Sequence, residues 1–205
     1  ERIKAFEKTL ADDGALILKF WMHLSREAQK DRLRKLEKNP LLHWRISKRD
    51  WQHWELYDQF MAAAERTIMK TSTGLAPWKI IEGYDERYRS IAVATIIRDA
   101  IRFRLDEAGK VSIGSNGDAS ARSKPAATEV SDSPPVTILS RLDMSKTLAK
   151  GDYEADLKRY QAKLNQLQRA AREHKVSTIL VFEGWDAAGK GGSIRRITAA
   201  LDARD

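Results

Sequence analysis

The residues whose types and spacing could do chemistry lie near the end of the chain, where 184–193 read Gly-Trp-Asp-Ala-Ala-Gly-Lys-Gly-Gly-Ser. This stretch has the phosphate-loop spacing G-x-x-x-x-G-K, in which glycines let several backbone N–H groups point into one concavity. The positive end of a following helix and the ammonium of Lys190 would add to that attraction for phosphate. A tight strand-to-helix turn is the plainer alternative. The loop residues expected to hold phosphate are Gly184, Ala187, Ala188, Gly189, Lys190, Gly191, Gly192 and Ser193.

The position after Lys190 departs from the usual loop, because Gly191 stands where a Ser or Thr hydroxyl normally holds magnesium. Another oxygen must then hold the ion. Asp186 is a carboxylate inside the loop and is expected to hold Mg2+ or orient the acceptor phosphate, with Ser193 as the weaker candidate. A carboxylate that caps backbone N–H groups of the loop is the alternative for Asp186. We expect Asp186 and Lys190 to be the catalytic residues.

A second set of candidate phosphate ligands lies in residues 25–50, where nine Lys and Arg side chains stand against four Asp and Glu. This excess suits an extended phosphate polymer, which offers one charge per unit and little shape. A solvated basic helix face is the alternative. Nucleic-acid binding would add exposed aromatic rings for stacking, but Trp51 and Trp54 fall on an apolar helical stripe and are expected in the core. The candidate phosphate or polyphosphate contacts are Arg196, Arg32, Arg45 and Lys48.

The elements that must position these groups follow from hydrophobic periodicity. Residues 15–21 and 176–182 are apolar nearly throughout, as strands covered on both faces would be, and residues 78–81 predict another short strand. Ser25 begins a basic helix that ends near Pro40. Apolar residues at steps of three and four predict one long helix over 51–68, a helix after Asp85 and a long helix over 153–171.

Residues 108–137 change composition abruptly, with six Ser, three Gly, three Pro, five Ala and no aromatic residue. Such a stretch buries too little apolar surface to offset its ordering entropy. We expect a flexible linker between two independently packed regions, 1–107 and 138–205. A long surface loop inside one domain is the alternative.

Composition excludes several classes of protein. A content of 42% hydrophobic residues with six Trp excludes a wholly disordered chain. No membrane span or signal-like apolar N-terminus is visible, so the sequence predicts a cytoplasmic protein. The absence of Cys and the scattered His residues argue against thiolate or zinc sites, which leaves an oxygen-bound metal. The net charge of +8 favours a polyanionic partner without choosing among them.

Residues 181–197, Val-Phe-Glu-Gly-Trp-Asp-Ala-Ala-Gly-Lys-Gly-Gly-Ser-Ile-Arg-Arg-Ile, resemble the first motif of the family-2 polyphosphate kinases. That family carries Asp within the loop and Gly-Gly after the Lys. The resemblance implies an α/β fold, a P-loop kinase-like three-layer sandwich, with Mg2+ as cofactor and inorganic polyphosphate as donor or product. It also implies catalytic-site roles for Asp186 and Lys190, with Arg196 at the family's basic position after the loop.

The first region resembles the other end of the same domain type, in Lys19–Ser25, Asn39-Pro40, Trp44-Arg45, Ser47, Asp50, Thr71-Ser72-Thr73 and Ala76-Pro77-Trp78. Residues 1–107 are therefore expected to be the C-terminal part of a first domain, with a strand, basic lid helices, a closing strand and a helix. Residues 138–205 would be the N-terminal part of a second domain with the phosphate loop. This order is that of an internal fragment of a tandem, two-domain member.

Tandem members of this family typically move phosphate from polyphosphate to AMP, giving ADP, and this is the expected function. The expected partners are inorganic polyphosphate and AMP or ADP, with no nucleic acid or membrane, while a homo-oligomer is left open. The family's second motif, Asp-Arg-Ser with a magnesium-binding aspartate, is absent from the chain, so we expect the fragment alone to be inactive. The alternatives are a nucleoside diphosphate acceptor, polyphosphate synthesis from nucleotide, a P-loop nucleic-acid ATPase, or a catalytically silent structural domain.

Overall fold

A three-stranded parallel sheet is the centre of the molecule, seen in a computed structural model that describes residues 1–111 and 137–201. The strands lie in the order β2-β1-β3, with Lys19 opposite Trp78 and Leu16 opposite Thr178. Their bounds are β1 Leu16–His23, β2 Trp78–Glu82 and β3 Thr178–Gly184.

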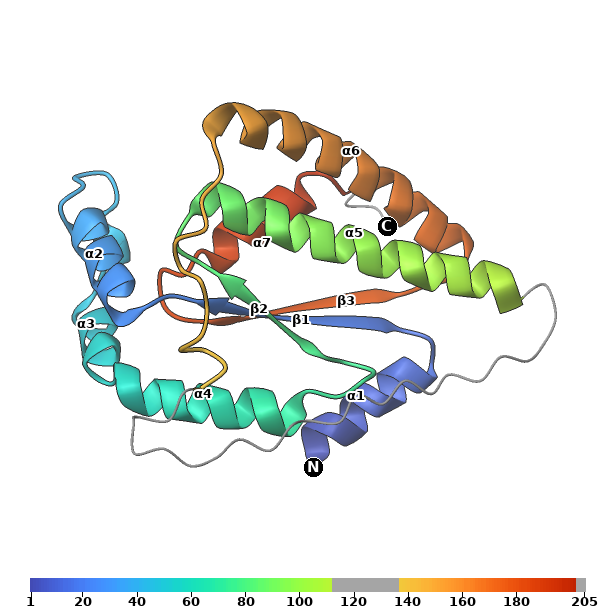
Figure 1. The fold of residues 1–205 in the computed structure, drawn as a ribbon, viewed down its shortest axis with the longest axis horizontal. Helices are drawn as coiled ribbons and strands as arrows, with labels where there is room; N and C mark the ends of the chain where they lie inside the picture. The colour runs from blue at the N-terminus through green and yellow to red at the C-terminus, as the bar shows by residue number, and fades with distance from the viewer. Residues whose placement is uncertain (112–136, 202–205) are drawn as a thin grey trace.

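Helices cover both faces of this sheet (Figure 1). One face carries α5 (Glu86–Val111), α6 (Lys150–Glu173) and α7 (Lys190–Thr198). The other face carries α1 (Arg2–Asp12) and α4 (Tyr57–Thr71). The predicted α/β fold, a three-layer sandwich, is confirmed.

The central strand β1 is buried on both faces, as its nearly continuous apolar sequence predicts. Phe20 and Met22 are fully buried on the side of α5 and α6, and the Phe20 ring stacks on Phe182 of β3 with centroids 5.0 Å apart. Trp21 belongs to a second cluster with Ala64 of α4. Side chains alternate across a strand, so β1 supplies the apolar centre of both layers.

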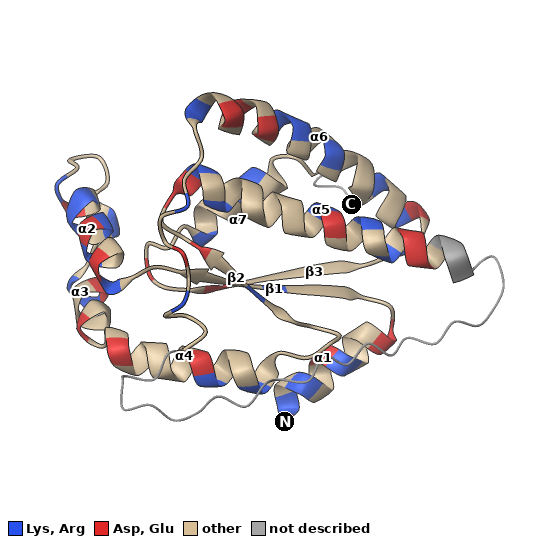
Figure 2. Ribbon diagram, in the orientation of Figure 1, with Lys and Arg blue, Asp and Glu red and all other residues tan. Residues whose placement is uncertain are grey.

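A lid lies beyond the carboxyl ends of the strands, at the left in Figure 1. It consists of α2 (Arg26–Glu37), the short 3-10 helix η1 (His43–Arg45) and α3 (Lys48–Glu55). The Ser25 side chain accepts a hydrogen bond from the Ala28 N–H, so the predicted helix start is confirmed. Figure 2 shows Lys and Arg along α2. None of the helices in the described ranges is long and apolar enough to cross a membrane.

The long helix predicted over 51–68 is interrupted at Leu56, which separates α3 from α4. Spacing of three and four continues across the break, so periodicity alone does not reveal it. Trp51 and Trp54 consequently lie on the lid and are half-buried, in contrast to the core position expected for them. Trp54 is held between Arg26 and Lys30, whose charged groups lie 5.0 and 4.7 Å from its ring centroid.

The two segments expected to pack independently share one sheet, because β3 pairs with β1. Segment 137–149 strengthens the connection: Leu139 is 2% exposed in the cluster of Trp21, and Lys146 donates to Glu82 at 2.7 Å. Helix α5 continues to Val111, past the predicted linker boundary at residue 108. The rest of the predicted linker, 112–136, lies outside the described residues.

Candidate phosphate site

The loop between β3 and α7 curls because three of its residues have positive φ. These are Gly184 (130°), Ala187 (60°) and Gly189 (92°), and Gly189 is the N-cap of α7. A Cβ atom on Gly184 would lie 2.2 Å from the Met22 carbonyl oxygen, and one on Gly189 would lie 2.2 Å from Cζ of Arg89. Glycine is therefore required at position 184 for conformation and for space, while at position 189 its φ favours glycine and a Cβ would displace the Arg89 side chain.

Lys190 folds back over this loop. Its Nζ donates to the carbonyl oxygens of Gly184 at 2.6 Å and Trp185 at 3.0 Å. Burial lowers the pKa of Lys190, while the charges of Asp186 and Glu183 act in the opposite direction. The ammonium is thus held at the mouth of the loop, where a phosphate oxygen could replace a carbonyl as its partner.

A cavity of about 890 Å³ lies between the loop, the lid and the start of α5. Cations outnumber carboxylates on its wall, which makes it suited to a polyanion. The cations are Arg32, Arg45, Arg89, Lys190, Arg195 and Arg196, and the carboxylates are Asp50, Glu86 and Asp186.

Two arginines join the phosphate loop to the turn that follows β2. Arg32 of α2 donates to the carbonyl oxygens of Ala187 (2.6 Å), Gly83 (3.0 Å) and Tyr84 (2.6 Å). Arg89 of α5 is 4% exposed and donates to Gly83 at 2.6 Å. Burial, and then the neighbouring charge of Arg32, lower the pKa of Arg89 to about 10, so it remains a cation at neutral pH. Its Nε has no hydrogen-bond partner among the described residues.

The guanidinium of Arg196 already has three partners within the protein. It donates to the Tyr153 hydroxyl at 2.7 Å and the Gly192 carbonyl at 3.0 Å, and it forms an ion pair with Glu86. Glu86 therefore already neutralises part of the charge that Arg196 offers to a phosphate.

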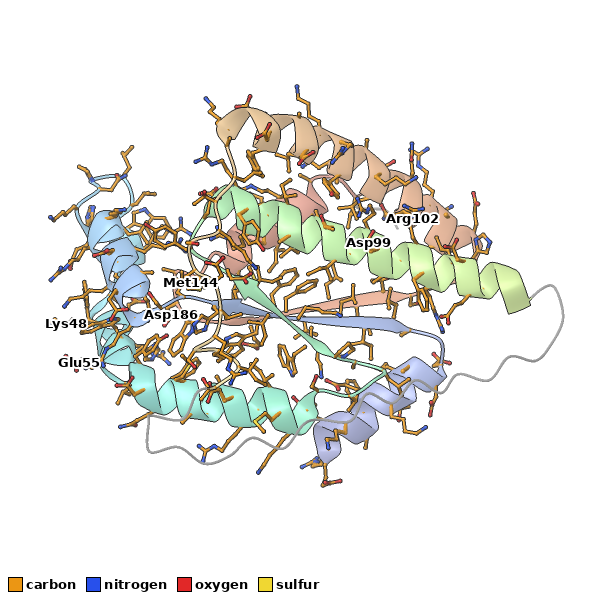
Figure 3. All side chains as sticks on the ribbon, in the orientation of Figure 1. Lys48, Glu55, Asp99, Arg102, Met144 and Asp186 are labelled. Carbon is orange, nitrogen blue, oxygen red and sulfur yellow. The ribbon has the colours of Figure 1, made fainter. Side chains whose placement is uncertain are left out.

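Asp186 faces the lid. Its Oδ2 lies 2.8 Å from Nδ1 of His53 in α3, and its main-chain oxygen lies 3.4 Å from Nε2 of Gln29 in α2. In Figure 3 Asp186 lies between the strand ends and the lid, whereas Lys48 lies at the outer edge of the molecule. Lys48 is exposed and does not line the cavity in the part of the chain that the structure describes.

The residues present suit magnesium only in part. Residues 1–111 and 137–201 contain no group of three His, Cys, Asp or Glu that could hold a metal by themselves. Magnesium is often bound by one or two carboxylates together with substrate phosphates, and Asp186 at the cavity wall fits that mode. Ser193 fits less well, because its residue is 1% exposed and its hydroxyl is buried without a described partner.

The structure thus brings Arg32, Arg45 and Arg196 to the same cavity as the loop, and leaves Lys48 and Ser193 outside it. Sequence reasoning missed Arg89, Glu86 and His53. Arg89 precedes the buried Val93 and Ile97 by four and eight residues, so a cation in an apolar helical stripe was the available signal. No local signal connects His53 with Asp186, because the two are 133 residues apart.

The sequence is similar to those of known proteins. The family model described as Polyphosphate kinase 2 matches residues 1–108 and 147–205. A polyphosphate:AMP phosphotransferase of Pseudomonas aeruginosa is 42% identical over 199 residues, which are 97% of this chain and 38% of that protein. An AMP/ADP-polyphosphate phosphotransferase of Meiothermus ruber is 36% identical over 99 residues, 48% of this chain and 37% of that protein.

Among solved structures, a crystal structure of a polyphosphate kinase 2 from Pseudomonas aeruginosa is 36% identical, with 98% of this chain and 35% of that chain covered and a TM-score of 0.40. The chain therefore spans well under half the length of these three relatives.

Proposed function

The chain belongs to the polyphosphate kinase 2 family, and on that premise we propose that the protein moves the terminal phosphate of inorganic polyphosphate to AMP, giving ADP. The observation that carries this proposal is a phosphate loop with Lys190 at its mouth, facing a cavity on which cations outnumber carboxylates. Phosphoryl transfer requires mainly positioning and charge stabilisation, and both are within reach of these groups. The similarity to a polyphosphate:AMP phosphotransferase supports AMP as the acceptor.

In this mechanism the phosphate oxygens replace the carbonyl partners of Lys190, and the loop N–H groups bind the same phosphate. The unpartnered Nε of Arg89 is a further donor at the back of the loop. Arg32 binds both the loop and the turn after β2, and so fixes their relative position. Arg45, which is exposed at the cavity wall, is available to the polymer.

Mg2+ is part of the proposal, with Asp186 as the residue that would hold it together with substrate oxygens. Bound magnesium would neutralise charge on the phosphates during transfer. Asp186 would have to share its carboxylate with His53, which already lies 2.8 Å away. We place the reaction in the cytoplasm, as the sequence predicts.

A second acceptor deserves a test, because the Meiothermus ruber relative is named for both AMP and ADP. The experiment incubates the intact protein with polyphosphate, magnesium and either AMP, ADP or GDP, and follows the product by chromatography. We expect ADP formation from AMP to be fastest. Equal or faster phosphorylation of a nucleoside diphosphate would replace AMP in the proposal, and no transfer to any nucleotide would refute it.

We also propose the tandem arrangement: residues 1–107 as the C-terminal part of a first domain, 108–137 as a linker and 138–205 as the N-terminal part of a second. The family model matches two separate stretches, and the Pseudomonas aeruginosa relative is covered over only 38% of its length. If both domains have the same fold, the C-terminal part of the first can pack on the N-terminal part of the second. This accounts for the pairing of β1 with β3 in this chain.

Spin labels can test this arrangement, since the chain contains no native Cys. Cysteines in place of the exposed Asp99 of α5 and Lys163 of α6 would carry the labels. The isolated chain should give a short distance, because α5 packs on α6. We expect a longer distance in the intact protein, and the same short distance in both would contradict the tandem arrangement.

A further inference from the structure

Trp185 occupies the first variable position of the phosphate loop, yet its side chain packs against α4 and the end of β1 and is only 3% exposed. Its ring stacks on Tyr57 of α4 with centroids 4.1 Å apart and planes 10° apart. Phe60, one turn along α4, lies 4.8 Å away in a tilted arrangement. Offset-stacked aromatic pairs add specific geometry to their buried area. The loop is therefore attached to α4 by a defined contact.

The polar edge of the indole is fixed as well. Nε1 of Trp185 donates to Nδ1 of His23 at the end of β1, at 3.3 Å. His23 is 3% exposed, and burial lowers its pKa to about 4 against the opposing charge of Glu82, so the ring is neutral and accepts this hydrogen bond. Tyr57 is fixed too, because its hydroxyl donates to the Leu24 carbonyl at 2.9 Å. Both stacked rings thus have one preferred position.

The main chain of Trp185 connects the position of the indole ring to the phosphate site. Its carbonyl oxygen accepts a hydrogen bond from Nζ of Lys190 at 3.0 Å, and its N–H donates to Met22 at 3.3 Å. The next residue is Asp186. A displacement of the indole therefore moves the acceptor that holds Lys190 and the residue that carries the loop carboxylate.

The other ring of the stack, Tyr57, lies directly after the lid in the sequence. Tyr57 is the first residue of α4, directly after the interruption at Leu56 that ends α3. A change in the angle between the lid and α4 acts on Tyr57 first, and through its ring on Trp185.

We propose that the stacked rings of Trp185 and Tyr57 form a joint, that is, a contact through which the position of the lid determines the position of the phosphate loop. Trp185 is then the positioning residue for Lys190 and Asp186. The proposal rests on the phosphate-binding function above. It predicts that the indole itself contributes no bond to phosphate, and that an aromatic ring at positions 185 and 57 is the property that matters.

The first measurement needs no ligand. The 205-residue chain is labelled with lysine carrying 13C at Cε, and the Lys190 resonance is assigned by its loss in Lys190→Arg. We expect Tyr57→Leu and Trp185→Ala to shift this resonance, and Trp185→Phe and Tyr57→Phe to leave it near its original position. Phe103→Leu, at a 65% exposed aromatic residue of α5, is the matched control and should shift nothing. An unshifted Lys190 resonance in Tyr57→Leu would overturn the joint.

The second measurement is calorimetric binding of tripolyphosphate to the same variants. We expect at least tenfold weaker binding for Tyr57→Leu and Trp185→Ala, and less than a threefold change for the two phenylalanine variants and for Phe103→Leu. Binding to Tyr57→Leu as tight as to the unchanged chain would overturn the joint. If tripolyphosphate fails to bind the unchanged chain, or binds Lys190→Ala equally well, the phosphate site itself fails, while the ligand-free resonances still decide the joint.

If Tyr57→Leu does not fold, as judged by circular dichroism, Trp185→Phe and Tyr57→Phe decide the proposal. Both retain the stacked ring and lose one hydrogen bond each, to His23 and to Leu24. Retained binding and an unshifted Lys190 resonance in both support the joint. A tenfold loss of binding in either would mean that the polar contacts, and not the stacked rings, position the loop, and would overturn it.

Discussion

Replacement of Gly189 by alanine tests the geometry of the loop more directly than any change to a charged residue. Gly189 has a φ of 92° and a Cβ there would lie 2.2 Å from Cζ of Arg89. Alanine in the left-handed region costs about 1–2 kcal/mol. Arg89 must also move, and loss of the hydrogen bond from a buried guanidinium to Gly83 costs about 1–3 kcal/mol more. We expect Gly189→Ala to lower the free energy of unfolding by about 2–5 kcal/mol.

The chain offers two matched controls. Gly14 has a φ of 91° but open space around its Cβ position, so Gly14→Ala measures the cost of the conformation alone. Gly191 lies in the first turn of α7 with nothing within 4 Å and no positive φ. Gly191→Ala should raise the free energy of unfolding by about 0.5–1 kcal/mol, because alanine restricts the unfolded chain.

The assay is urea unfolding of the 205-residue chain followed by circular dichroism, with the three alanine variants compared at equal slope. From the most stable to the least stable, the expected order is Gly191→Ala, unchanged chain, Gly14→Ala, Gly189→Ala. If Gly189→Ala costs no more than Gly14→Ala, Arg89 does not lie against the loop and the description of the site is wrong.

Three further predictions follow from the site. In the intact protein, Lys190→Ala and Asp186→Asn should each lower kcat at least a hundredfold, about 3 kcal/mol, and near-normal kcat for both would move the chemistry to another site. The pKa of His23 is lowered from 6.5 to about 4, so only the unfolded chain gains a proton between these values. Stability should then fall by up to about 3 kcal/mol as pH drops from 6.5 to 4, and His23→Gln should remove most of this dependence if the assignment is correct. The isolated chain should form no ADP from polyphosphate, AMP and magnesium, because the Asp-Arg-Ser motif is absent, and formation of ADP near the rate of the intact protein would contradict this.

The parts of the fold that could be predicted are those with a local cause. The strand at 16–23 can be recognised in the sequence as a nearly continuous apolar run, because both of its faces are covered. The N-cap at Ser25 and the loop before α7 follow from residue types at fixed spacing. The break at Leu56 was not predictable, since the apolar spacing passes through it unchanged.

The parts of the site that could not be predicted depend on contacts between distant segments. Arg196 lines the cavity, as expected of a phosphate contact, but nothing in its local sequence indicates that Glu86 and Tyr153 already bind its guanidinium. Arg32 was expected to contact phosphate as a lid cation. Its guanidinium instead holds three main-chain oxygens of the loop and of the turn after β2. Charge counts identify cations near a site and do not say which of them are free to bind a ligand.

The pairing of β1 with β3 explains how this site forms in a chain whose two segments we propose to belong to different domains. The two edges of β1 each carry backbone N–H and C=O groups that need partners, and residues 78–82 and 178–184 supply them. The lid and α4 of the first segment then meet the loop of the second with complementary groups: His53 with Asp186, and Tyr57 with Trp185. Contacts this specific are expected if each tandem domain makes the same contacts between its own two halves. We therefore expect the isolated chain to bind phosphate at the loop and, lacking the Asp-Arg-Ser motif that the family resemblance implies, not to transfer it.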